Sequence, residues 1–260
     1  TADALQCLRM SVALQPGYVA GLCNLGNVLS DCGDIAGAVG AFSKAAVLDP
    51  DSAAIQTNLG LSLLETGQTP EAVRALERAV QLEPDNAQAK NNLGNALKQQ
   101  GHGTQALAMY RSAWESQGLV DAGINLSTTL KEQGLLDDAH AIAAQVCQLH
   151  PGHATAWKAL GLVQQERGQA AQAAAALGKA LELGDRAVET YYWMAILLSE
   201  AQEPERALPV IDAGLALHAH SSDLISAKMA LLLKLARNQE VLELGARAQA
   251  NGLTNAHILQ

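Results

Sequence analysis

The sequence has few of the residues that mark several common classes of protein. Aromatic residues make up 3% of its 260 residues, with a single phenylalanine, so small aliphatic side chains must fill any core. No apolar run approaches the ~18–20 residues of a membrane-spanning helix, so we expect no membrane span. The formal net charge of −9 argues against a nucleic-acid partner, which requires a basic surface. It favours a basic or neutral protein partner instead.

Cysteine is equally sparse. The four cysteines, Cys7, Cys23, Cys32 and Cys147, include no CxxC pair, so neither a zinc site nor a redox motif is indicated. We expect small, partly buried residues on helices, with a disulfide or metal role as the alternative. Unpaired thiols suit a reducing compartment, so we expect a cytoplasmic protein.

Side chains that carry chemistry do not gather in a pattern. His150 and His153 in "HPGH", and His218 and His220 in "HAH", fall in predicted turns without acidic or thiol ligands at metal-binding spacing. No glycine-rich phosphate loop follows a strand. We therefore predict no catalytic residue, no metal, no cofactor and no enzyme activity in this segment.

The chain does have one alanine that returns at an almost constant interval. The separation is 34 residues, or 33 once, between Ala4, Ala38, Ala72, Ala106, Ala139, Ala173 and Ala207. A small residue lies twelve positions earlier, at Gly26, Gly60, Gly94, Ser127, Gly161 and Ala195. A turn glycine lies five positions earlier, at Gly33, Gly67, Gly101, Gly134 and Gly168. So regular a period predicts a solenoid built from one stacked supersecondary unit.

Each repeat is predicted to hold two helices. The turn glycine suits a left-handed helix cap, and prolines such as Pro50, Pro84 and Pro151 end the second helix. We expect the small residue of the first helix to face the alanine of the second. The two backbones then approach to the short end of the usual ~8–10 Å range.

The segments "CNLGNVL", "TNLGLSL", "NNLGNAL" and "WKALGLV" carry this pattern and resemble the tetratricopeptide repeat (TPR) family. The resemblance implies an all-α, right-handed α-solenoid of about seven tandem 34-residue helix-turn-helix repeats. Full repeats are predicted at 19–52, 53–86, 87–119, 120–153, 154–187, 188–221 and 222–255 of one superhelical domain. Residues 1–18 are predicted to be the second helix of a partial repeat, and 256–260 the start of a further helix. Since both ends fall inside a repeat, we expect a piece of a longer protein.

Asparagine also keeps the register in four successive repeats. Its positions are Asn24, Asn58, Asn92 and Asn125, and the same face carries Asn27 and Asn95 three residues further on. This face points roughly 150° away from the buried stripe, and in the TPR fold it lines the concave groove. One amide can pair with one peptide unit. First helices spaced about 10 Å apart would then meet an extended peptide every three residues or so. The alternative is that asparagine is merely common in such repeats.

The resemblance extends to particular members of the family. "NLGNVL" and "NNLGNALK" are most similar to repeats in the TPR region of O-linked N-acetylglucosamine transferase, where asparagines form such a row. The carboxylate clamp of other TPR proteins is not indicated, because Cys23, Gln88 and Asn92 stand where it needs cations. Tyr192 and Trp193 fall off the buried stripe. They either form an anchor pocket in the groove or pack partly buried against the next repeat.

These patterns predict a protein-interaction scaffold that binds an extended peptide segment in its concave groove. A second hypothesis is the substrate-recruiting arm of a larger enzyme, such as an O-GlcNAc-transferase-like glycosyltransferase. A third is self-association, because the ends of a repeat stack expose apolar faces.

Overall fold

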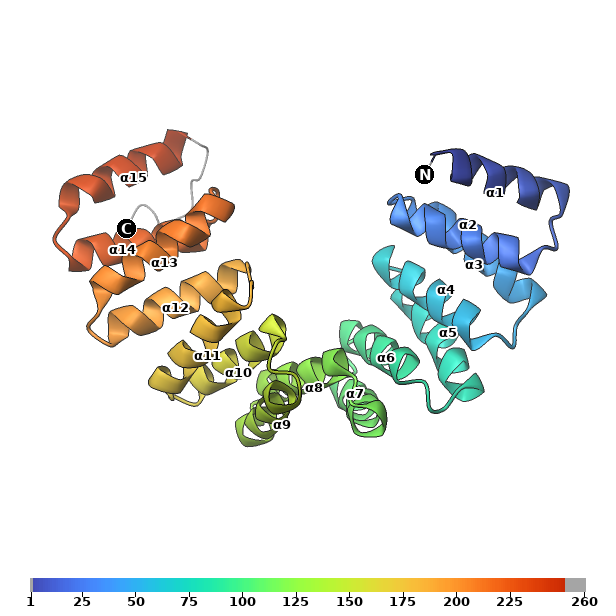
Figure 1. The fold of residues 1–260 in the computed structure, drawn as a ribbon, viewed down its shortest axis with the longest axis horizontal. Coiled ribbons are helices and arrows are strands. Elements are labelled where there is room, and N and C mark those ends of the chain that lie inside the picture. Colours follow the sequence, from blue (N-terminus) through green and yellow to red (C-terminus); the bar gives the residue numbers. More distant parts are fainter. Residues whose placement is uncertain (1, 251–260) are drawn as a thin grey trace. The chain divides into compact units, whose positions relative to one another are not determined.

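The computed structural model describes residues 2–250, and every regular element in this range is an α-helix (Figure 1). This confirms the predicted all-α repeat architecture. None of the described helices combines the length and the apolar composition that a membrane span requires. The predicted helix start at 256–260 and the end of the last predicted repeat, 251–255, lie outside the described residues.

The helices alternate between two kinds, which we call first and second helices of a repeat. The first helices are α2 (Val19–Asp31), α4 (Ala53–Glu65), α6 (Ala87–Gln99), α8 (Val120–Glu132), α10 (Ala154–Glu166), α12 (Val188–Glu200) and α14 (Ser222–Lys234). The second helices are α1 (Ala2–Leu14), α3 (Ile35–Leu48), α5 (Thr69–Leu82), α7 (Gly103–Gln117), α9 (Leu136–Leu149), α11 (Ala170–Glu182), α13 (Pro204–Leu217) and α15 (Asn238–Ala250).

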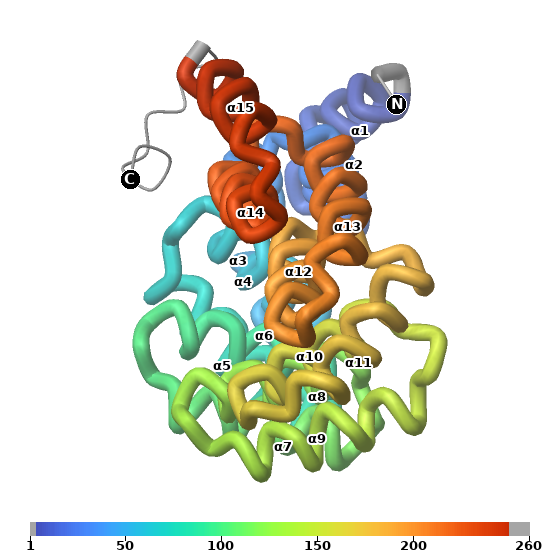
Figure 2. Tube along the Cα trace, turned by 90° about the vertical axis from the view of Figure 1, so that its left-hand side faces the viewer, coloured from blue at the N-terminus to red at the C-terminus, as the bar shows by residue number. Residues whose placement is uncertain are grey.

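The chain divides into two compact units, residues 1–129 and 130–260, which we call the N-terminal and C-terminal units. Within each unit, consecutive helices run antiparallel and are joined by short turns (Figure 2). The right-handed twist of a single superhelical domain concerns the arrangement of the two units and stays a prediction.

The turn inside each repeat has one geometry. Gly33 has φ of 80°, and the next residue, Asp34, donates its backbone N–H to the Leu29 carbonyl at 2.9 Å, which is a Schellman cap. Glycine also adopts positive φ at Gly67, Gly101, Gly134 and Gly168. In the last two repeats, Gln202 (φ 64°) and Ala236 (φ 56°) adopt it without glycine. A side chain in this conformation costs roughly 1–2 kcal/mol, so these two turns are strained.

The repeating alanines form the centre of each helix pair. From Ala38 to Ala207 they are 0% exposed, at Ala38, Ala72, Ala106, Ala139, Ala173 and Ala207. The small residue of the first helix, however, chiefly faces the large residue four positions after the alanine. A Cβ on Gly60 would lie 2.5 Å from Leu76 Cγ, and one on Gly94 would lie 2.5 Å from Tyr110 Cε1. The predicted glycine–alanine approach is thus only part of this packing. At Gly161 the Ala173 carbonyl oxygen also lies 3.2 Å from the Cβ position, but at Gly60 and Gly94 a bulky side chain lies across the bare backbone and fills the space.

Candidate functional site

The asparagine face of α2 and α4 surrounds a surface hollow of about 250 Å³. Its lining residues are Asn27, Ser30, Asp31, Phe42, Asn58, Leu61, Ser62 and Glu65. Asn24 and Asn27 are exposed and Asn58 is half-buried. Within residues 2–250, none of these three side-chain amides has a hydrogen-bond partner. Asn27 and Asn58 therefore present free donors and acceptors in the hollow, and Asn24 lies on the same face of α2, three residues before Asn27.

The same face of α6 and α8 is occupied by its own contacts. Asn125 donates through Nδ2 to Asn91 Oδ1 at 2.9 Å and to Asn95 Oδ1 at 3.2 Å. The Tyr110 hydroxyl donates to the same Asn95 oxygen at 2.8 Å. These four side chains form a polar cluster, which we call the Asn91 cluster. Because its members satisfy one another, Asn95 and Asn125 are tied into the structure and are less available to a ligand.

Asn92 differs from the rest of the predicted row. It is only 3% exposed, and its Oδ1 accepts a hydrogen bond from Gln88 Nε2 at 3.1 Å. Its Nδ2 is buried with no partner. The expectation that this side chain points away from the buried stripe into the groove thus does not describe Asn92. The wheel argument considers one helix alone, whereas burial depends on what the rest of the stack places against each position.

Tyr192 and Trp193 occupy α12, with Trp193 at the register that asparagine holds in α2 and α4. Their ring centroids lie 5.3 Å apart with an interplanar angle of 81°, an edge-to-face pair. Both are half-buried. Each is anchored on a different apolar cluster: Tyr192 packs on the one containing Ile211 and Leu224, and Trp193 on the one containing Leu177 and Leu197.

A hollow of about 510 Å³ opens beside this aromatic pair. It is lined by Val188, Glu189, Tyr192, Trp193 and Asp223. Both carboxylates are exposed, and neither forms an ion pair within the described chain. We call this region the aromatic–acidic pocket. It combines two ring surfaces with two negative charges in a volume that suits a side chain of a bound molecule.

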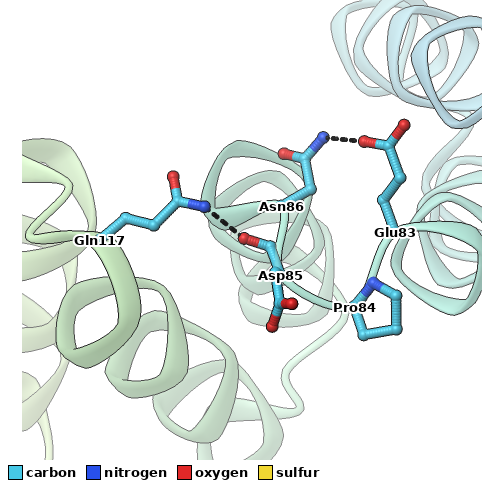
Figure 3. Close-up of a pocket in the computed structure, with 5 residues that line it drawn as sticks. All are labelled: Glu83, Pro84, Asp85, Asn86 and Gln117. Atoms are coloured by element: carbon cyan, nitrogen blue, oxygen red, sulfur yellow. Dashed lines mark hydrogen bonds between the residues drawn. The ribbon is translucent and has the colours of Figure 1, made fainter.

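Another hollow, of about 500 Å³, lies at the turn between α5 and α6 (Figure 3). Asn86 donates to Glu83 Oε2 at 2.8 Å and accepts from the backbone N–H of Ala89 at 2.9 Å, capping α6. Gln117, at the end of α7, donates to the Asp85 carbonyl oxygen (Figure 3). The side-chain amides around this hollow already form hydrogen bonds within the protein, so we interpret the hollow as part of a turn between repeats that these bonds stabilise.

The titratable side chains show little sign of reactivity. Burial raises the pKa of the Cys147 thiol to about 11, so the thiol stays protonated at neutral pH. Burial, with a smaller contribution from Asp49, also raises the pKa of Cys23. Burial and then the charge of Arg167 lower the pKa of His140. No group of three or more potential metal ligands occurs among the described residues.

Family models of tetratricopeptide repeats match the chain in overlapping segments. One described as a TPR repeat matches residues 60–101, and two described as tetratricopeptide repeats match 86–117 and, for the second, 23–71 and 124–188. Together they cover more than half of the chain. The chain belongs to the TPR family. Members of this family generally act in protein–protein interaction, and a chain of TPR repeats alone is generally a non-catalytic scaffold. No curated protein sequence matches.

Solved TPR structures share this fold at low sequence identity. YrrB, described as a TPR protein with an unusual peptide-binding site, is 23% identical, with a TM-score of 0.54 over 68% of this chain and 92% of YrrB. The pilF protein of Pseudomonas aeruginosa is 21% identical, with a TM-score of 0.69 over 80% and 95% of the two chains. A chain of the APC/C Cut9–Hcn1 assembly is 17% identical, with a TM-score of 0.73 over 89% of this chain and 46% of that one.

Sequence reasoning missed several residues that the structure brings together. Asn91 is one position out of register with the row, and the "NN" doublet at 91–92 was its only signal. Glu189 and Asp223 were also missed, although each lies in the first turn of its first helix, 34 residues apart. Residues that share a register in successive repeats lie beside each other in the stack, and this rule would have found the pair.

Proposed function

We propose that this chain is a protein-interaction scaffold whose first helices hold an extended peptide segment. The observation that supports the proposal is the set of unpaired side-chain amides on this face: Asn27 and Asn58 line the hollow of α2 and α4, and Asn24 lies three residues before Asn27. Asparagine within a helix costs roughly 0.6 kcal/mol relative to alanine. Among the described residues no hydrogen bond of these three side chains offsets that cost, so binding provides a reason for them.

The chemistry of this surface suits the backbone of a ligand. Each amide offers a donor pair and an acceptor, which matches the N–H and C=O groups of one peptide unit. Asp31 and Glu65 at the rim are exposed and have no ion-pair partner among the described residues, so basic side chains of the segment would be favoured. A likeness in fold to YrrB, whose described property is an unusual peptide-binding site, is compatible with this mode of binding.

The test begins with selection from a library of random peptides of about 21 residues, long enough to cross the seven first helices from α2 to α14 at about three residues each. The selected peptides are titrated against the wild type and the triple variant Asn24→Ala, Asn27→Ala, Asn58→Ala. Each hydrogen bond lost should weaken binding by about 0.5–1.5 kcal/mol, whatever the peptide sequence, because backbone contacts do not read side chains.

A matched control removes three exposed amides from second helices, with Gln81→Ala, Gln105→Ala and Gln148→Ala. This variant should bind like the wild type. Full affinity of the asparagine variant, with its helical circular dichroism unchanged, would refute the proposed groove.

The recruiting arm of a larger glycosyltransferase is a second candidate function. It is favoured by the asparagine register in four successive first helices, on which the resemblance to O-linked N-acetylglucosamine transferase rests. The genomic sequence adjoining this segment provides the test. A catalytic domain encoded in the same reading frame supports this function, and its absence removes it.

We also propose that the protein works in a reducing compartment and that it self-associates through the ends of its repeat stack. All four cysteines are free thiols. Sedimentation at several protein concentrations tests the second point, since a concentration-independent monomer would contradict it.

A further inference from the structure

We propose that the aromatic–acidic pocket binds an arginine side chain of the partner segment. This inference rests on the proposed function, because it assigns one part of the bound peptide. The pocket lies in the C-terminal unit, between α12 and α14, and shares no residue with the asparagine-lined hollow of α2 and α4.

The aromatic pair supplies the first half of the recognition. In an edge-to-face arrangement one ring directs its edge at the other, so the partner ring does not cover the faces of the first ring. A guanidinium is flat, delocalised and weakly hydrated, and it stacks on such ring faces more readily than an ammonium does. Since both rings rest on buried apolar clusters, they are held in place before a ligand arrives.

The carboxylates supply the second half. Glu189 and Asp223 line the same hollow as the rings. Among the described residues, Asp223 Oδ1 accepts a long hydrogen bond from the Ser222 hydroxyl at 3.5 Å, and neither carboxylate forms an ion pair. Each carboxylate lies in the first turn of a helix, where the helix dipole stabilises a negative charge. Stabilisation by the dipole alone would not require aromatic neighbours. Because the hollow has carboxylates beside aromatic rings, the guanidinium of an arginine can stack on a ring while it donates hydrogen bonds to a carboxylate.

The probe is Nα-acetylarginine amide, followed by the indole N–H signals of the three tryptophans in a two-dimensional NMR titration. We expect a saturable shift of the Trp193 signal, while buried Trp114 provides an internal control that does not move. The lysine analogue should bind more weakly. The citrulline analogue has the same shape without the charge and should give no saturable shift. Equal shifts from arginine and citrulline, or no shift from arginine, would overturn the proposal.

Two variants separate the contributions. The double variant Glu189→Gln, Asp223→Asn changes exposed side chains only and should weaken arginine binding about fivefold. The charge-matched control Glu200→Gln, Glu205→Gln alters two exposed carboxylates of the same unit away from the pocket and should leave binding unchanged. Trp193→Leu should weaken binding about tenfold. An unaltered affinity in the Glu189/Asp223 variant would contradict the assignment even if Trp193→Leu failed to fold.

The probe and the peptide library distinguish a failure of the arginine pocket from a failure of the proposed scaffold. If the library yields peptides without arginine enrichment and the arginine probe leaves Trp193 unshifted, the pocket assignment fails and the scaffold stands. If the probe binds and the library yields no peptide, the pocket assignment stands and the scaffold fails. If both hold, replacing arginine by citrulline in a selected peptide should remove the effect of Trp193→Leu.

Discussion

In the N-terminal unit, every turn inside a repeat has a glycine at its positive-φ position, whereas in the C-terminal unit Gln202 and Ala236 replace it in the last two turns. The hydrogen bond that defines the cap persists: Glu203 N–H still reaches the Leu198 carbonyl at 2.9 Å, as Gln68 N–H reaches that of Leu63 at 2.8 Å. The turn geometry is therefore imposed by the packing of the two helices. Glycine makes that geometry cheaper without being required for it.

The polar register differs more between the units than the apolar register does. Alanine is fully buried at the repeat position in both units, as at Ala72 and Ala207. At the asparagine position, by contrast, the C-terminal unit carries buried Ala159, half-buried Trp193 and buried Ala227. The alanine inside each helix pair must fit that pair, whereas the asparagine register is exposed at Asn24 and buried at Ala159, so its surroundings differ from repeat to repeat.

The sharpest test of the shared core is a glycine substitution in each unit. Gly60→Leu should destabilise the protein by about 1–3 kcal/mol, because fully buried Leu76 has no room to yield. Gly178→Ala should instead stabilise it by about 0.5–1 kcal/mol, since its new Cβ would have only Met194 Cε within contact, at 3.8 Å. Urea denaturation measures both. Equal effects of the two substitutions would show that glycine–leucine packing does not hold the repeat.

An exchange at the asparagine register tests the second difference. Asn125→Ala should cost about 1–2 kcal/mol, because Asn91, which is 3% exposed, loses its donor. Ala159→Asn should cost a similar amount by burying an amide without a partner at a site that is 6% exposed. The control Asn24→Ala alters an exposed side chain and should change stability by less than about 0.5 kcal/mol. If Asn125→Ala were as mild as Asn24→Ala, the Asn91 cluster would contribute nothing to stability.

The turns give the smallest effect. Gln202→Gly should stabilise the C-terminal unit by about 1 kcal/mol, because glycine removes the steric cost of a positive φ. The reverse change, Gly67→Gln, should destabilise the N-terminal unit by a similar amount. Melting temperatures of the two variants provide the measurement. A loss of stability in Gln202→Gly would mean that the Gln202 side chain makes a contact whose stabilisation exceeds the strain of the positive φ.

Much of the fold could be predicted from the sequence because each repeat packs mainly against its neighbours. The period places Ala72 and its equivalents in the core. The glycine before each second helix predicts the turn, because few other residues readily adopt a positive φ. The partner of Gly60 was not predictable in this way. Choosing between Ala72 and Leu76 requires the crossing geometry of the two helices, which periodicity does not specify.

The candidate sites, like the fold, could be predicted from the sequence only in part. The sequence by itself determined the repeat, the all-α class and the shared face of Asn24, Asn58, Asn92 and Asn125, because residue spacing fixes which side chains share a helix face. Only the tertiary structure decided which of these amides are free and which are used internally. It also decided that Glu189 and Asp223 meet Tyr192 and Trp193 in one hollow. Exposure and pairing depend on what the neighbouring helix places against a side chain, and that distance of a few ångströms is a property of the stack.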